Sequence, residues 1–254
     1  MNLRPLAALV TAAMLSACGS DAVQSITTPP AGSAVKFFNF GVGSPGVNLF
    51  ANDTKVTATS STTGAESTTG TVYGGAASGG FYTSLAPGQY TLTGRIPSTA
   101  TADANRSIST LSTALADGKY YSLYQSGIYN RTTKTAESFI VEHPIPTADF
   151  SVAYVRFVNA ISNAQPMTLY AKSSVTGTES AVGGAVAYKS AGAFVALPPA
   201  SYDLNTRYAG SGTNVITRTA VSFSAGHSYT ISARGDITSS ATATKPALDL
   251  TANW

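Results

Sequence analysis

The chain of 254 residues repeats its own sequence once, and this duplication constrains the fold more than any other feature. Four blocks recur in the same order, at offsets that fall from 120 residues to 112 and then to 108. Chance similarity would not keep four blocks in register, and a period of this length indicates tandem domains rather than a solenoid. The recurring pairs are 35–39 with 155–159, 47–50 with 167–170, 85–92 with 197–204, and 118–123 with 226–231.

The duplication sets the expected domain boundaries. We place the first repeat at residues 34–146 and the second at 152–254, joined by a short linker at 147–151. Prolines lie just before that linker, so we expect the connection to be stiff. The first repeat also carries an insertion rich in Ser, Thr and Gly at Thr57–Thr71. We interpret it as a mobile loop, with a binding tip as the alternative.

Both repeats have the composition and alternation of β-strands. Tyr, Thr, Val, Phe and Ile are plentiful, and these residues favour half-buried pleated surfaces. Apolar and polar residues alternate with a period of two at 90–93, 121–123 and 229–232. We expect about seven or eight short strands in each repeat, which is typical of a β-sandwich. The predicted fold is therefore all-β, with two tandem antiparallel β-sandwiches of the Ig-like or transthyretin-like kind.

Three shared motifs carry a family resemblance. A Val-Lys/Arg-Phe-x-Asn strand opens each repeat, a Pro-Gly/Ala-x-Tyr-x-Leu turn lies near its middle, and Gly-x-x-Tyr-Ser/Thr-Leu/Ile follows later. Together they resemble the bacterial domain-of-unknown-function family 4397. The resemblance implies an envelope or secreted protein with tandem domains, and it brings no established activity. The family's usual acidic residue after the first strand is absent at 40–46 and at 160–166, so no role of that residue carries over.

The N-terminal segment has the pattern of a processing signal. Arg4 gives a short positive region, and residues 6–15 are apolar but too few to span a bilayer. Leu15-Ser16-Ala17-Cys18 then resembles the lipobox of bacterial lipoproteins. The resemblance implies that residues 1–17 are a lipoprotein signal peptide and that the Cys18 thiol is the lipid attachment site. Residues 18–33 would follow as the lipidated cysteine and a flexible tether.

A lipid anchor at Cys18 has consequences for location. The resemblance implies a diacylglyceryl group on the thiol and an acyl chain, such as palmitate, on the new amino group. Two or more chains give stable membrane anchoring where one does not. Cys18 is the only cysteine, so the mature domains would contain no disulfide. Gly19 rather than Asp follows it, which favours the outer membrane in a Gram-negative host. We expect a lipid-anchored protein of the cell envelope.

Charge is sparse, and this excludes several classes of protein. Only 11% of the residues are charged, against about 25% in typical domains. The apolar content, at 43%, is enough for a core, so the chain is not expected to be disordered. No cluster of Lys and Arg could neutralise a row of phosphates, so we expect no nucleic-acid partner.

Candidate chemical motifs are weak, and we predict no catalytic residue, cofactor or metal. Gly41–Gly46 matches the dinucleotide fingerprint but is followed by a predicted strand rather than a helix, so we interpret it as a loop. His143 lies near the linker and His227 at a strand start, where the first repeat has Lys119. We expect both histidines to be solvated polar residues. No Gly-x-Ser-x-Gly elbow and no carboxylate pair is present.

Tyrosine is the one abundant residue type that could support binding, with 13 copies. Tyr90, Tyr121, Tyr202 and Tyr229 fall at matched positions of the repeats, and core packing with a hydrogen-bonded hydroxyl explains them. A second set has no counterpart in the other repeat and is interpreted as ordinary strand packing, with surface contact to glycan or protein as the alternative. Its members are Tyr120, Tyr124 and Tyr129.

The function predicted from the sequence is non-enzymatic. We expect a membrane-anchored envelope lipoprotein that binds or spaces something at the surface, with an envelope protein or a glycan as the partner. A structural or assembly role through an exposed strand edge is the alternative. A hydrolase is the remote alternative, because it would need convergent titratable groups in a concave site.

Overall fold

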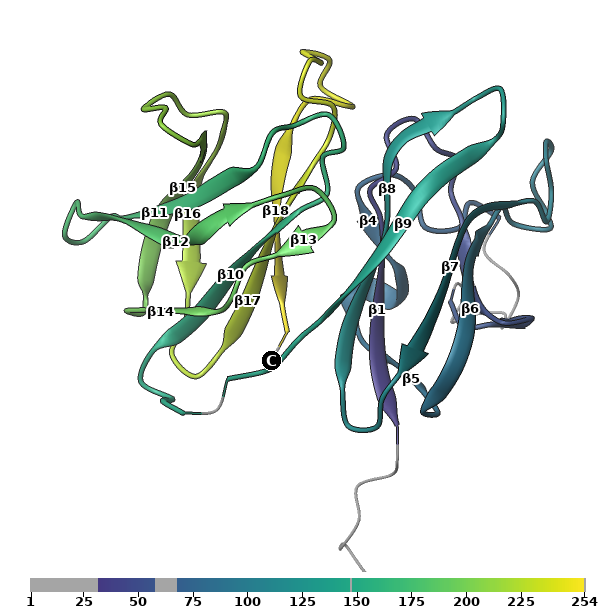
Figure 1. Ribbon diagram of the computed structural model, residues 1–254, viewed down its shortest axis with the longest axis horizontal. Helices are drawn as coiled ribbons and strands as arrows, with labels where there is room; N and C mark the ends of the chain where they lie inside the picture. The colour runs from purple at the N-terminus through teal and green to yellow at the C-terminus, as the bar shows by residue number, and fades with distance from the viewer. Residues whose placement is uncertain (1–31, 58–67, 147, 254) are drawn as a thin grey trace, which may run out of the picture. The chain divides into compact units, whose positions relative to one another are not determined.

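The computed structural model describes residues 32–57, 68–146 and 148–253. Cys18, the predicted signal peptide, most of the tether and residues 58–67 of the predicted Thr57–Thr71 loop lie outside the described residues. The regular secondary structure of the described chain is almost entirely β-strand (Figure 1), so the predicted all-β class is confirmed. From Gly32 onward the chain forms one compact unit. In the part that the structure describes, no helix is long and apolar enough to cross a bilayer.

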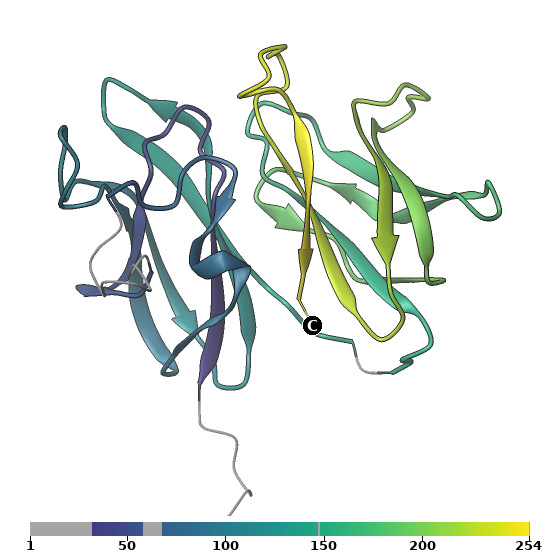
Figure 2. The same ribbon diagram turned by 180° about the vertical axis from the view of Figure 1, so that it is seen from behind.

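The first repeat contains two sheets. A five-stranded sheet has the order β4-β1-β8-β9, with β5 also paired to β1, and a four-stranded sheet has the order β3-β2-β6-β7. A short 3-10 turn, η2 (Ala77–Gly80), follows β4 and is visible beside β1 in Figure 2. The strands are β1 (Ser33–Asn39), β2 (Asn48–Ala51), β3 (Thr54–Lys55), β4 (Gly75–Ala76), β5 (Thr83–Leu85), β6 (Gly88–Arg95), β7 (Ser107–Leu115), β8 (Tyr120–Asn130) and β9 (Thr135–Glu142).

The second repeat reproduces this topology strand for strand. Its five-stranded sheet has the order β13-β10-β17-β18 with β14 also paired to β10, and its four-stranded sheet has the order β12-β11-β15-β16. The duplication seen in the sequence is therefore a duplication of the whole sandwich. The strands are β10 (Ala153–Asn159), β11 (Met167–Ser173), β12 (Glu179–Val186), β13 (Ser190–Ala191), β14 (Val195–Leu197), β15 (Ala200–Tyr208), β16 (Ile216–Phe223), β17 (Ser228–Arg234) and β18 (Ala247–Ala252).

One strand pair in each sandwich is parallel, within sheets that are otherwise antiparallel. β1 runs parallel to β8 with Val35 opposite Tyr121, and β10 runs parallel to β17 with Val155 opposite Tyr229. The first strand of each repeat thus lies inside the five-stranded sheet rather than at its edge. Alternation in sequence does not reveal this, because a side-chain period of two is the same in parallel and antiparallel strands.

β1 and β10 are buried on both faces, whereas β11 alternates between buried and half-buried positions over most of its length. Val155 and Phe157 point into the core of the second sandwich, and Val35 and Phe37 into that of the first. The opposite faces meet in a third cluster, which joins residues of both repeats. Its members are Phe38, Phe40, Tyr124, Phe139, Val141, Val158 and Ala160. We call this contact between the two five-stranded sheets the joint.

Candidate functional site

Two equivalent cations cross the joint. Lys36 on β1 and Arg156 on β10 occupy the same position of the repeated first strand, 120 residues apart. The Lys36 Nζ donates to the Ala252 carbonyl oxygen at 2.5 Å, and the Arg156 Nη1 donates to the Glu142 carbonyl oxygen at 2.8 Å. Ala252 and Glu142 are themselves equivalent, because they pair with Tyr229 and Tyr121. Each sandwich therefore donates to the last strand of the other, in a pseudo-two-fold arrangement.

An aromatic ring covers each cation within its own sandwich. The Lys36 Nζ lies 4.3 Å from the centroid of the Tyr82 ring, and the Arg156 guanidinium carbon lies 4.9 Å from that of Phe194. Tyr82 and Phe194 directly precede the equivalent strands β5 and β14. Cations held over ring faces away from water are stabilised by the ring quadrupole, which offsets part of the cost of burying them.

Both ring nitrogens of His143 form hydrogen bonds within the joint. Its Nε2 lies 2.7 Å from the Ser122 Oγ, and its Nδ1 lies 2.8 Å from the Arg156 Nη2. Arginine only donates, so Nδ1 must accept and the ring proton lies on Nε2. Burial, together with the charges of Arg156 and Lys36, lowers the pKa of His143 to about 2. Near neutral pH this imidazole has neither a free lone pair nor a second proton, so it cannot act as a general acid or base.

The expectation that His143 is a solvated residue is wrong. Only 2% of its surface is exposed, because the chain after β9 follows the joint before it reaches the linker. His227 is exposed, as expected, with its Nδ1 2.9 Å from the Ala225 carbonyl oxygen. The two histidines therefore have unrelated environments. Among the residues that the structure describes, no group of three His, Cys, Asp or Glu side chains could hold a metal ion.

The matched tyrosines behave as predicted. The Tyr202 and Tyr90 hydroxyls donate to carbonyl oxygens four residues earlier, at 2.7 and 2.9 Å. The Tyr121 and Tyr229 hydroxyls each accept a backbone N–H at 3.1 Å. Tyr90 is half-buried and the other three are buried.

The three tyrosines without a counterpart pack against neighbouring side chains, which agrees with their interpretation as ordinary strand packing. Tyr124 is fully buried in the joint, and Tyr129 packs against the core of the first sandwich. Tyr120 makes an edge contact with Tyr82, with 5.2 Å between the ring centroids. The Gly41–Gly46 segment is a loop between β1 and β2, as expected.

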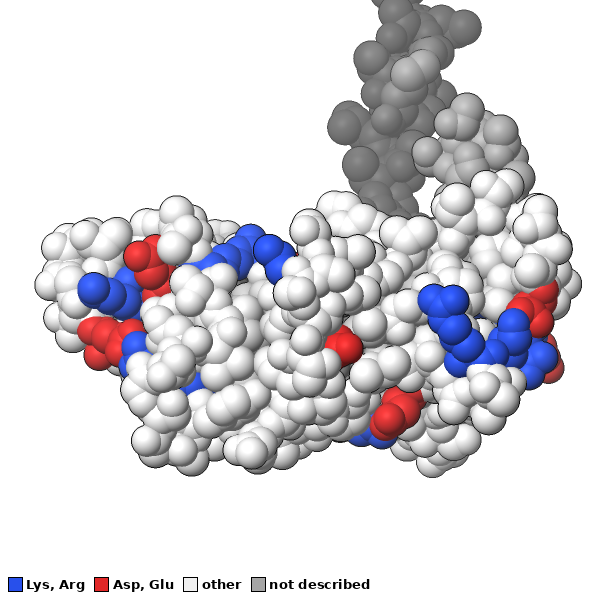
Figure 3. All heavy atoms as spheres, turned by 90° about the horizontal axis from the view of Figure 1, so that it is seen from above, with Lys and Arg blue, Asp and Glu red and all other residues white. Residues whose placement is uncertain are grey.

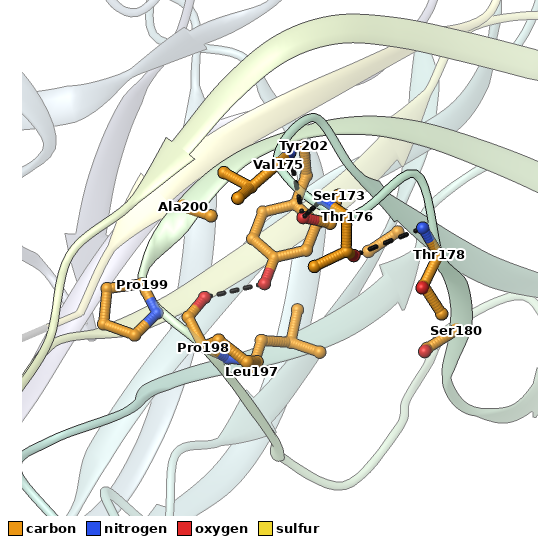
Figure 4. Close-up of a pocket in the computed structure, with 11 residues that line it drawn as sticks. Ser173, Val175, Thr176, Thr178, Ser180, Leu197, Pro198, Pro199, Ala200 and Tyr202 are labelled. Carbon is orange, nitrogen blue, oxygen red and sulfur yellow. Dashed lines mark hydrogen bonds between the residues drawn. The ribbon is translucent and has the colours of Figure 1, made fainter.

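An open pocket lies at one end of the second sandwich. It has a volume of about 340 Å³ and is formed by the turn between β11 and β12 and the turn between β14 and β15. In Figure 4 the Tyr202 ring lies between these two turns, with its hydroxyl bonded to the Pro198 carbonyl. Val175 at the pocket is 79% exposed. We call this space the end pocket.

The end pocket is lined by apolar side chains and hydroxyl groups, and by no Asp, Glu, His, Lys or Arg. Its one titratable group is the Tyr202 phenol, whose pKa is raised by burial. The pocket therefore lacks a group that could exchange a proton near neutral pH. It can hold an apolar ligand group and donate or accept hydrogen bonds through hydroxyls. The hydroxyl-bearing residues other than Tyr202 are Ser173, Thr176, Thr178 and Ser180.

Sequence reasoning missed the joint and both of its cations. The motif Val-Lys/Arg-Phe-x-Asn was interpreted as a core strand, with no role for its second position. A cation at the same place in both copies of an otherwise apolar strand was the available signal, because Lys and Arg are almost never fully buried without partners. The end pocket had no signal of its own, since its hydroxyls are not distinguishable from the many other Ser and Thr residues.

The fold and these sites define a class of tandem β-sandwich protein with no assembled catalytic centre among the described residues. Residues 153–253 match the model of a family described as a domain of unknown function, DUF4397. The predicted resemblance is thus confirmed for the second repeat, and the family description assigns no activity. A candidate cell adhesion protein of known structure from Bacteroides ovatus aligns over 88% of this chain and 96% of its own, at 12% identity and a TM-score of 0.23. No curated protein matches the chain.

Proposed function

We propose that the chain is a non-enzymatic lipoprotein of the cell envelope, tethered through a lipid on Cys18, whose paired sandwiches bind a partner at the surface. The anchoring part rests on the lipobox of the sequence. The partner is an envelope protein or a glycan, and an outer-membrane location follows if the host is Gram-negative.

One contrast supports a binding role over an enzymatic one. His143 and Arg156 are bonded to each other in the joint, while the end pocket contains no acid or base of suitable pKa. An enzyme needs such groups at a site that a substrate can reach. Figure 3 adds that charged side chains form a few separate groups on the face shown, with uncharged surface between them. Such a surface suits contact through apolar and hydroxyl groups.

A binding assay with a matched pair of variants tests this role. Purified 19–254 should bind isolated envelopes saturably, and Val175→Asp should weaken that binding because it puts a charge at the end pocket. Val72→Asp is the control, since Val72 is also exposed but lies in the other sandwich. Equal binding by both variants would exclude the end pocket. Turnover of an esterase, glycosidase, peptidase or phosphatase substrate by the wild type would exclude the non-enzymatic role.

Anchoring has a separate test. Wild-type protein should incorporate labelled palmitate and stay with membranes after a carbonate wash, whereas Cys18→Ser should do neither. Retention of the Cys18→Ser variant in washed membranes would contradict the proposed anchor.

A second candidate, assembly through a strand edge, is favoured by β12. This strand ends the four-stranded sheet of the second sandwich, and Glu179 is its only charged residue. Both carboxylate oxygens of Glu179 are bonded to Arg207, at 2.7 and 2.8 Å. An uncharged edge strand can pair with a strand of another chain. Ala181→Lys should then abolish assembly with a partner without changing the fold, because Ala181 is exposed on β12 and does not line the end pocket.

A further inference from the structure

The joint has an opening of its own, which is separate from the end pocket of the second sandwich. A groove of about 480 Å³ runs between the two sandwiches on the Lys36 side. Its walls combine apolar side chains with a buried amine and polar groups. The residues that line it include Lys36, Phe38, Phe81, Tyr82, Leu250 and Asn253. We call this space the Lys36 groove.

The pseudo-two-fold arrangement supplies an internal comparison for this groove. On the other side, Arg156 donates to the Glu142 carbonyl, the His143 Nδ1 and the Thr230 Oγ1, so each of its three guanidinium nitrogens has a protein acceptor. Among the residues that the structure describes, Lys36 donates only to the Ala252 carbonyl. At this repeated position, Arg156 thus has an acceptor for each of its nitrogens. Lys36 has an acceptor among the described residues for only one of its three ammonium protons.

Two polar atoms beside Lys36 also have no hydrogen-bond partner among the described residues. Asn253 stands where the other side has His143, and its Nδ2 donates to Thr230 while its Oδ1 has no partner. Tyr82 stands where the other side has Phe194, and its hydroxyl has no partner. Only 5% of the surface of Asn253 is exposed. Buried polar atoms without partners are costly, so their presence calls for an explanation.

No carboxylate in the part that the structure describes forms an ion pair with Lys36, and burial alone lowers its pKa, to about 8. The ammonium group therefore remains mostly charged near neutral pH. A buried cation without a counter-ion attracts an anion more strongly than an exposed one, because water screens it less. The groove thus combines a positive group with apolar lining side chains, among them Phe38 and Leu250.

The rim of the groove adds an aromatic surface. Ser78, Gly79 and Gly80 all have positive φ angles, of 51, 65 and 83°, and this turn leads directly into Phe81. Phe81 is 76% exposed. An exposed ring beside a buried cation suits a ligand that has an apolar part as well as a charge.

We propose that the Lys36 groove binds a carboxylate that carries a neighbouring N–H group and an apolar side chain, as an N-acylated apolar amino acid or the last residue of a peptide does. The carboxylate accepts from the Lys36 ammonium and the Tyr82 hydroxyl. The N–H donates to the Asn253 Oδ1. The apolar side chain packs against Phe38, Phe81 and Leu250.

N-acetylphenylalanine is the first probe, titrated into purified 19–254 and followed by NMR. We expect saturable binding in the millimolar range. The uncharged N-acetylphenylalanine amide should bind at least about tenfold more weakly, and 3-phenylpropionate, which lacks the N–H, should lie between them. A hexapeptide ending in Phe, compared with its C-terminally amidated form, distinguishes a peptide end from a free acid as the source.

Lys36→Met should reduce affinity for N-acetylphenylalanine at least about tenfold, while Lys172→Met, a change of an exposed lysine, should leave it unchanged. Tyr82→Phe copies Phe194 of the other side and removes one hydroxyl, so it should fold and weaken binding a few-fold. Equal binding of the acid and the amide, or equal binding by Lys36→Met and wild type, would overturn the proposal. Envelope binding by the end pocket should survive Lys36→Met, which separates the two proposals.

Discussion

Tyr124 and Ser232 occupy equivalent positions of the two repeats, and their hydroxyl oxygens lie 3.1 Å apart across the joint. Each faces the first strand of its own repeat, Tyr124 opposite Phe38 and Ser232 opposite Val158. Equivalent residues meet in this way only near a two-fold axis, as in an isologous dimer interface. The joint is therefore built like a homodimer contact within a single chain.

Tyr124 should be one of the main contributors to the stability of the joint. Its ring stacks on Phe38 and on Phe139, with 5.0 Å between the centroids in both cases. Tyr124→Ala should lower the free energy of unfolding by about 3–5 kcal/mol, the usual cost of truncating a buried aromatic residue. Tyr124→Phe keeps the stacking and leaves the Ser232 hydroxyl without this partner, so it should cost only about 1 kcal/mol. Urea unfolding of both variants measures the difference, and equal losses would contradict the stacking argument.

The same substitution should destabilise the protein at Arg156 but not at Lys36, although the two cations are equivalent. Arg156→Met leaves the His143 Nδ1 and the Glu142 carbonyl without their donor, so it should destabilise by about 1–3 kcal/mol. Lys36→Met removes a buried amine that has one hydrogen bond, and it leaves the Ala252 carbonyl without this donor. The free energy of unfolding should therefore stay the same or rise. Thermal unfolding of the pair provides the comparison. A larger loss from Lys36→Met than from Arg156→Met would show that Lys36 has partners comparable to those of Arg156.

The matched tyrosines of the two repeats should differ in their contribution to stability. Tyr202 is buried beside Phe223, with 5.5 Å between the ring centroids, whereas Tyr90 is only half-buried. Tyr202→Ala should cost roughly 3–5 kcal/mol and Tyr90→Ala clearly less, because less apolar area returns to water. Denaturant unfolding of both variants checks the order. A change below about 1 kcal/mol for Tyr202→Ala would be inconsistent with a core position.

Much of the fold could be predicted because the duplication and the alternation are local features of the sequence. The blocks at 85–92 and 197–204 are turn and strand signals, and the structure has β5, β14 and the following strands there. The parallel placement of β1 and β10 could not be predicted, since it depends on which strands meet rather than on any one strand. The boundaries at 34–146 and 152–254 stay predictions, as do the lipid on Cys18 and the envelope location.

The joint shows what a residue-by-residue interpretation leaves out. Burial of both faces of β1 is visible in the sequence only as an apolar segment interrupted by Lys36, and such a segment has the same appearance whether its second face meets a helix, another sheet or a second domain. His143 was interpreted as a solvated residue near the linker, because Pro144 and Pro146 follow it in the sequence. Its partners, Ser122 and Arg156, are 21 and 13 residues away.

His143 makes the joint sensitive to acid, and this gives a prediction with a defined pH window. Its pKa is about 2 in the folded protein and 6.5 when unperturbed, so between these values the unfolded chain binds the additional proton. Stability should therefore fall as pH is lowered from 6.5 toward 2, since protons are taken up on unfolding. His143→Asn copies Asn253 of the other repeat and removes this titration. The free energy of unfolding, measured from pH 7 to pH 3, should consequently have a shallower pH dependence in the variant than in wild type. A parallel pH dependence of the two proteins would contradict a neutral His143 bonded to Arg156.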